Sequence, residues 1–359
     1  MNTTVILDSN FTVGSTPDLM KDFVKDRQYR FESYTQRCIL ASIFVFIFVV
    51  GTIGNSLVIL AVLFSRKLRT FTNVFVVNLS VADLLICISL SMNIVALLST
   101  DGFPLPDVIC AAAAFVAFTG VGCSVYTLAV IALSRWAVIT RSISTQRSWF
   151  TVKKLVAMVI FTWLVPAVIA FLPPFLGLGQ LGYAEKYSTC SHKTSHDLSD
   201  FYSLLQGVLF YPVPLVIIIV CYYKVFTFVR LHSKNIVEQP DVSSTSVPTN
   251  QNYLQSRNQH AQKERLSRRQ IEITKNLFYV VLAFLICITP FGVSLMIPPS
   301  DPAIPWTSTL LLFNSCVNPV IYATKHPNFK KIFRQIVTCR WADIPEPSRI
   351  LKFIRCSTY

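Results

Sequence analysis

The feature that most constrains this chain is a series of seven long segments with almost no charged residues. Each is close to the roughly 20 residues that an α-helix needs to cross a hydrocarbon core of about 30 Å. Lipid offers no partner to unpaired backbone groups, and the segments lack the alternation of barrel strands, so each is expected to form one spanning helix. The segments are Cys38–Ser65, Phe71–Thr100, Val108–Ser134, Leu155–Leu172, Phe201–Tyr223, Asn276–Ser300 and Ala303–Thr324.

Composition separates this interpretation from the alternative, a large soluble core of buried helices. The chain is 53% hydrophobic and 14% charged, whereas soluble proteins average about 25% charged residues. A soluble fold would also need seven helices that are apolar on every side, with almost no amphipathic ones. The sequence therefore predicts an all-α fold, a seven-transmembrane helix bundle over residues 38–324.

The distribution of charge predicts the orientation of the bundle. The segments after the first, third and fifth spans and the C-terminal tail hold 25 Lys and Arg against 6 Asp and Glu, whereas the N-terminus and the other loops hold 7 against 11. Because basic loops stay inside, residues 1–37 are expected to be extracellular and the tail 339–359 cytoplasmic, in the plasma membrane. The net charge of +14 then needs no nucleic acid to explain it.

Two segments on the predicted cytoplasmic side have distinct compositions. Residues 233–262 are rich in Ser, Asn, Gln and Thr and are expected to form a disordered loop. Within 325–338, apolar residues repeat at helical spacing among basic ones, which predicts a short amphipathic helix on the anionic lipids of the inner leaflet. Cys339 follows this helix and is a candidate for palmitoylation.

The predicted outer side carries the candidates for oxidation and glycosylation. Most of the ten cysteines lie within apolar runs, whereas Cys110 and Cys190 face the oxidising side and are expected to form a disulfide. Asn2 and Asn10 begin glycosylation sequons. The chain has no HExxH, P-loop or GxSxG motif, so no enzyme activity is expected. Asp83 is the one carboxylate at membrane depth, which marks it as a functional residue.

Short motifs fall in order along nearly the whole chain. They are Gly54-Asn55, Leu79-Ser80-Val81-Ala82-Asp83, Cys110 and Arg135 at the two ends of the third span, Trp163, Pro214 with Tyr222, Pro290, and Asn318-Pro319-Val320-Ile321-Tyr322. On these residues the chain resembles a rhodopsin-like (class A) G-protein-coupled receptor. Asn314-Ser315-Cys316 and the missing acid before Arg135 make it loosely similar to melatonin-type and related orphan receptors.

The resemblance implies a receptor that transduces an extracellular ligand to heterotrimeric G proteins by outward movement of the sixth helix, with arrestin and receptor kinases as further partners. It implies roles in activation for Arg135, Tyr222, Tyr322, Asn318, Pro319, Pro290 and Phe284. It also implies an allosteric sodium ion, because a carboxylate with hydroxyl and amide oxygens suits a hard cation. The matching sodium positions are Asp83, Ser124, Asn314, Ser315 and Asn318.

Three positions depart from the family pattern. Ser134 stands where an acidic residue usually precedes the arginine, and Gln270, near the start of the sixth helix, is also uncharged. Ile288 stands where the family commonly has Trp, which leaves Phe284 as the aromatic switch. Without an acidic partner for Arg135, elevated ligand-free signalling is expected. A constitutively active or non-coupling receptor is the alternative within the family.

Two positions restrict the ligand. Ala117 replaces the aspartate of amine receptors, and Leu312 replaces the lysine that binds retinal, so neither a monoamine nor retinal is expected. Lys186 and Lys193 are left open to an acidic ligand group or to solvent. A transporter or channel would use several intramembrane charges and broken helices, whereas this chain has one such charge. The expected pocket for a small apolar or aromatic ligand is Ala117, Phe118, Phe210, Tyr211, Ile288, Phe291 and Leu312.

Overall fold

The computed structural model describes residues 30–193, 198–237, 278–297 and 301–357. The two sequons at Asn2 and Asn10, Gln270, and the predicted loop from residue 238 onward lie outside the described residues.

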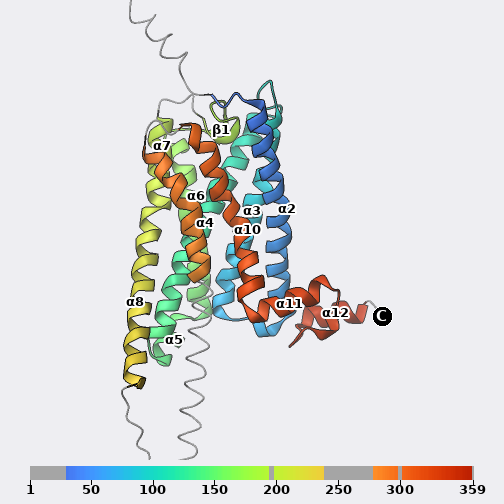
Figure 1. Cartoon of the computed structure of the whole chain (residues 1–359), viewed down its shortest axis with the longest axis vertical. Coiled ribbons are helices and arrows are strands. Elements are labelled where there is room, and N and C mark those ends of the chain that lie inside the picture. The colour runs from blue at the N-terminus through green and yellow to red at the C-terminus, as the bar shows by residue number, and fades with distance from the viewer. Residues whose placement is uncertain (1–29, 194–197, 238–277, 298–300, 358–359) are drawn as a thin grey trace, which may run out of the picture.

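The described chain forms an elongated bundle of long helices that run along one axis (Figure 1). Six of its helical segments are long and apolar enough to cross a membrane. The seventh, α10, has 22 residues and carries several buried polar side chains. The predicted seven-helix fold is thereby confirmed. The long helices are α2 (Tyr34–Phe64), α3 (Phe71–Leu98), α4 (Asp107–Thr140), α6 (Val152–Phe175), α7 (Ser199–Phe210) with α8 (Pro212–Val237), the helix Phe278–Met296, and α10 (Ile304–Lys325).

Several helices begin or end at residues other than the ends of the apolar runs. The fifth predicted span is two helices, α7 and α8, with Tyr211 between them. Pro212 explains the break, because proline lacks the N–H and its ring clashes with the carbonyl four residues earlier. α4 runs to Thr140, six residues past the predicted end, and α8 runs to Val237, into the segment predicted as a loop.

Short elements close the two ends of the bundle. At one end, β1 (Leu181–Ala184) and β2 (Thr189–His192) form an antiparallel hairpin that the sequence analysis did not predict. At the other end lie η1 (Arg66–Leu68), α5 (Ile143–Trp149) and α11 (Pro327–Val337), the last of these confirming a helix after the seventh span. The elements η2 (Asp301–Ala303), η3 (Trp341–Asp343) and α12 (Arg349–Ser357) complete the described structure.

Small and polar residues set how closely the helices pack. A Cβ added to Gly54 of α2 would lie 2.8 Å from Pro319 Cβ of α10, so these two helices approach each other directly. The amide of Asn78 in α3 donates to Thr127 Oγ1 at 2.8 Å and Thr162 Oγ1 at 3.1 Å, and its oxygen accepts from Trp163 Nε1 at 2.8 Å. Buried polar groups of this kind fix the relative positions of α3, α4 and α6.

Candidate functional site

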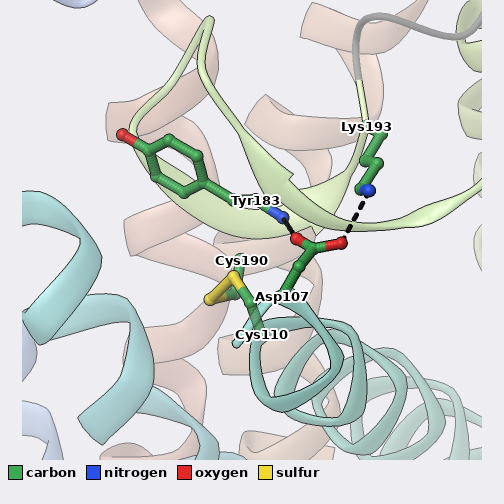
Figure 2. Close-up of polar contacts among 5 residues, drawn as sticks. All are labelled: Asp107, Cys110, Tyr183, Cys190 and Lys193. Atoms are coloured by element: carbon green, nitrogen blue, oxygen red, sulfur yellow. Dashed lines mark hydrogen bonds and ion pairs between the residues drawn. A yellow bond between two sulfur atoms is a disulfide. The ribbon is translucent and has the colours of Figure 1, made fainter. Parts of the chain in front are cut away.

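The β1–β2 hairpin is fastened to the start of α4 (Figure 2). Cys110 of α4 and Cys190 of β2 form the expected disulfide, which is confirmed. Next to it, the Asp107 carboxylate accepts the backbone N–H of Tyr183 at 3.0 Å and pairs with Lys193 Nζ at 2.6 Å. One covalent and two polar contacts therefore hold both strands over this helix.

A second attachment joins the hairpin turn to the start of the seventh helix. Asp301 lies 2.8 Å from Lys186 Nζ and accepts a hydrogen bond from the Tyr187 hydroxyl at 2.8 Å. Partial burial raises the pKa of Asp301, but the hydrogen bonds from Lys186 and Tyr187 together outweigh it and leave the pKa below its usual value. Lys186 and Lys193, which the sequence left open to an acidic ligand group, are thus each paired with an aspartate.

A group of aromatic rings gathers below the hairpin. The His192 ring stacks on Phe118 at 4.4 Å between centroids and lies 4.3 Å from Tyr202. Its Nδ1 lies 3.0 Å from Ser203 Oγ. Burial lowers the pKa of His192 to about 4, so the ring is neutral at physiological pH. From the sequence, His192 was expected in a solvated outer loop and not among the ligand residues, because only the folded hairpin brings it onto α4.

The other predicted ligand residues divide into two groups. Ala117, Tyr211, Phe291 and Leu312 are partly exposed, as is Phe118. Tyr211 also reaches the sixth helix, where its hydroxyl lies 3.1 Å from Thr289 Oγ1. In contrast, Phe210 and Ile288 are packed in the core, at 6% and 3% exposure. These two residues shape the bundle beneath the aromatic rings.

A buried polar cluster lies in the middle of the bundle around Asp83, which is fully buried. Its Oδ1 accepts hydrogen bonds from Ser124 at 3.3 Å and Ser315 at 3.2 Å, and its Oδ2 accepts one from Asn318 Nδ2 at 2.9 Å. Two helices, α4 and α10, therefore supply the groups that surround this carboxylate of α3. The structure brings together four of the five residues that the family resemblance assigned to a sodium ion.

The chemistry of this cluster fits a small hard cation. Within the described ranges, the carboxylate of Asp83 forms no ion pair with a basic side chain. The oxygens Asn314 Oδ1 and Asn318 Oδ1 are buried and have no hydrogen-bond partner there. Carboxylate and amide oxygens are the ligands that hard cations prefer. A cation would satisfy both the charge and the orphaned oxygens.

The end of α4 far from the hairpin holds Arg135 at 1% exposure. Its guanidinium donates a hydrogen bond to Thr72 Oγ1 of α3. The neighbouring Ser134 hydroxyl bonds to the backbone carbonyl of Ile131 at 2.7 Å, within its own helix. The buried hydroxyls of Tyr222 and Tyr322 have no hydrogen-bond partner among the described residues. Thr72 is a second residue that the sequence analysis missed.

Of the remaining predicted activation residues, Phe284 and Pro319 are buried and Pro290 is partly buried. Phe284 is 3% exposed in a core cluster that also contains Tyr322. Pro319 is buried within α10, and the carbonyl of Pro290 accepts a hydrogen bond from Ser294 Oγ at 2.9 Å. A serine hydroxyl that bonds to the carbonyl four residues earlier often accompanies a bend in a helix.

Comparison with known proteins identifies this arrangement. The family model of the 7 transmembrane receptor (rhodopsin family) matches residues 54–322. The chain belongs to this rhodopsin family of receptors. It is 29% identical over 308 residues to melatonin receptor type 1C of Gallus gallus, an alignment that covers 83% of this chain and 81% of that one. It is similarly 29% identical to melatonin receptor type 1A of Mus musculus, covering 83% and 80%.

More distant rhodopsin-family proteins cover as much of the receptor. 5-Hydroxytryptamine receptor 4 of Homo sapiens is 26% identical over 339 residues, or 90% of this chain and 85% of that one. The crystal structure of squid rhodopsin superposes with a TM-score of 0.69 at 20% identity, covering 84% and 87%, and supports the fold. The chain is therefore a G-protein-coupled receptor of the plasma membrane with an extracellular ligand, and not an enzyme.

Proposed function

We propose that this receptor binds a small, uncharged aromatic or apolar ligand beneath the extracellular hairpin. The observation that carries the proposal is the neutralisation of the nearby cations, because Lys186 and Lys193 are each already paired with an aspartate. Ala117 offers no counter-ion for an amine, and His192 is neutral. The stacked rings of His192 and Phe118 then supply most of the recognition surface.

Similarity to the melatonin receptors supports a compact aromatic ligand of this kind. It does not identify the ligand as melatonin. The similarity to a 5-hydroxytryptamine receptor extends to the fold, but Ala117 leaves the amine of such a ligand without a partner. The proposal therefore favours neutral over cationic ligands.

Ligand class is tested by a signalling screen of matched neutral aromatic, cationic amine and anionic lipid compounds. Phe118→Ala is expected to weaken any active compound at least tenfold, because it removes the ring that stacks on His192. Phe175→Ala removes a ring that is 74% exposed and is the matched control. Activity confined to cationic amines would refute the proposed ligand class.

The proposed signal passes to the cytoplasmic end by outward movement of the helix Phe278–Met296. Arg135 then leaves Thr72 and turns toward Tyr222 and Tyr322, whose buried hydroxyls have no other partner among the described residues. The opening accepts a heterotrimeric G protein, and arrestin and receptor kinases act on the same cytoplasmic surface. This orientation places the N-terminus outside and the C-terminus, with Cys339 as a palmitoylation candidate, inside.

Basal G-protein dissociation in cells tests the coupling step. Arg135→Ala is expected to abolish a basal signal that the wild-type receptor shows at equal surface expression. Arg141→Ala is the matched control, because Arg141 is exposed and its guanidinium lies over the face of Trp136, 5.0 Å from the ring centroid. A basal signal that survives Arg135→Ala would contradict the role of Arg135. A silent wild-type receptor would favour the non-coupling alternative.

A sodium ion is proposed as the allosteric cofactor of this receptor. Asp83, Ser124, Asn314, Ser315 and Asn318 would hold it, and it would supply positive charge to a carboxylate that lacks a basic partner. Sodium is expected to raise the thermal stability of the purified receptor relative to choline at equal ionic strength. Asp83→Asn should remove this difference, whereas Ser89→Ala, whose hydroxyl bonds only to the Ile86 carbonyl, should keep it. Equal stability of the wild-type receptor in the two salts would refute the site.

A further inference from the structure

The cytoplasmic tail contains a second short amphipathic helix, α12, where the sequence analysis expected a plain tail. Ser348 caps its first turn, because its Oγ accepts the backbone N–H of Leu351 at 3.3 Å. Residues three apart lie on the same face of a helix. Arg349 and Lys352 therefore share one face, and Ile350 and Phe353 share another.

The segment before α12 is docked on the cytoplasmic end of α2 through backbone contacts. Ser65 and Pro347 form an isolated antiparallel bridge. The Ser348 N–H donates to the Phe64 carbonyl at 2.8 Å, and the Arg66 N–H donates to the Glu346 carbonyl at 2.9 Å. These contacts place α12 against the last turn of a membrane-spanning helix.

Side chains complete the attachment. Leu351 is fully buried in a small cluster with Phe64 and Ile344. The Trp341 ring lies 6.2 Å from Phe64, and the Ser65 hydroxyl donates to the Pro345 carbonyl at 2.7 Å. The tail is thus part of the folded receptor, and Leu351 fixes which faces of α12 point away from it.

The faces of α12 that point away from α2 carry exposed apolar and cationic side chains. Phe353 is 75% exposed and Ile350 is 48% exposed, although both lie beside the end of a span. Figure 1 shows α11 and α12 side by side in the picture, extending across the long axis of the bundle at its lower end. Basic side chains surround this region. Those exposed are Arg66, Lys67 and Arg69 of the first loop, Lys330, Lys331 and Arg334 of α11, and Arg349 and Lys352 of α12.

We propose that α12 is a second membrane-surface helix, which joins α11 in binding the anionic lipids of the inner leaflet. Phe353 and Ile350 enter the boundary between headgroups and acyl chains, and Arg349 and Lys352 contact the lipid phosphates. Charge complementarity favours this occupant over an acidic protein, because the exposed apolar residues adjoin a span that already lies in lipid. The proposal goes beyond ligand binding and does not depend on which ligand the receptor takes.

Hydrogen exchange of the full-length receptor in lipid nanodiscs tests this proposal. Amides of 349–357 are expected to exchange about tenfold more slowly in nanodiscs that contain phosphatidylserine than in phosphatidylcholine alone, because two basic residues gain contact with anionic lipid. Phe353→Glu and Lys352→Glu should remove the difference. Phe353→Leu should keep it, which separates loss of insertion from loss of the helix. Lys154→Glu changes the same charge on an exposed residue in the first turn of α6 and is the control.

Two outcomes would overturn the proposal. The first is equal exchange of α12 in the neutral and anionic nanodiscs. The second is equal protection by soluble inositol hexakisphosphate in neutral nanodiscs, with Phe353→Glu behaving as the wild-type receptor. That result would assign the basic residues to a free polyphosphate and leave Phe353 without a role in the membrane.

Discussion

Protonation of His192 is expected to destabilise the hairpin end of the receptor in mild acid. Burial lowers the pKa of this ring to about 4, against an ordinary value of 6.5. The unfolded state therefore binds the proton more readily, so stability is fully present above about pH 6.5 and is lost as pH falls toward 4. Linkage across this interval gives a loss of about 2 kcal/mol at pH 5 relative to pH 7.5.

The assay is thermal unfolding of the purified receptor between pH 7.5 and pH 5, for the wild-type chain and for His192→Phe. The variant keeps an aromatic ring against Phe118 and Tyr202 but cannot take up a proton. Its melting temperature should fall roughly 3 °C less than that of the wild type over the interval. Other groups that titrate over this interval do so in both proteins and cancel in the difference. Parallel pH profiles for the two proteins would refute the assignment of a buried, neutral His192.

Two further predictions concern packing and covalent closure. Gly54→Ala should lower the free energy of unfolding by about 1–3 kcal/mol, because the new Cβ would lie 2.8 Å from Pro319 Cβ, and thermal unfolding measures the loss. Unchanged stability would mean that α2 and α10 separate easily. Cys110→Ala should open the loop of 80 residues that the disulfide with Cys190 closes, and should lower the free energy of unfolding by about 4–5 kcal/mol. The loss should be seen as reduced surface expression, which Cys38→Ala should not cause.

The sequence was most informative where lipid dictates the structure. Lipid requires continuous helices of a set length, so the apolar runs located the spans. The polar cluster around Asp83 could be predicted equally well from the sequence, since few polar residues lie at membrane depth and those that do contact one another. The ends of helices were harder, because α4 continues to Thr140 in a polar environment that no longer selects apolar residues.

The missed features depend on contacts between segments that are distant in the sequence. His192 reaches Phe118 only because a disulfide draws its strand over α4. Helix α12 has an amphipathic pattern, but its nine residues form a stable helix only once Leu351 is buried against α2. Tertiary burial, and not local propensity, determines both features.

The hydrogen bond between Arg135 and Thr72 shows how the absence of an acidic residue before Arg135 affects activation. Releasing a buried guanidinium from a neutral hydroxyl costs about 1.5–3 kcal/mol, whereas breaking a buried ion pair costs about 3–5 kcal/mol. The difference corresponds to roughly a tenfold larger population of the released state. Ser134→Asp should therefore lower basal G-protein dissociation about tenfold, and Thr72→Val should raise it. An unchanged basal signal in Ser134→Asp would show that Arg135 release does not limit activation.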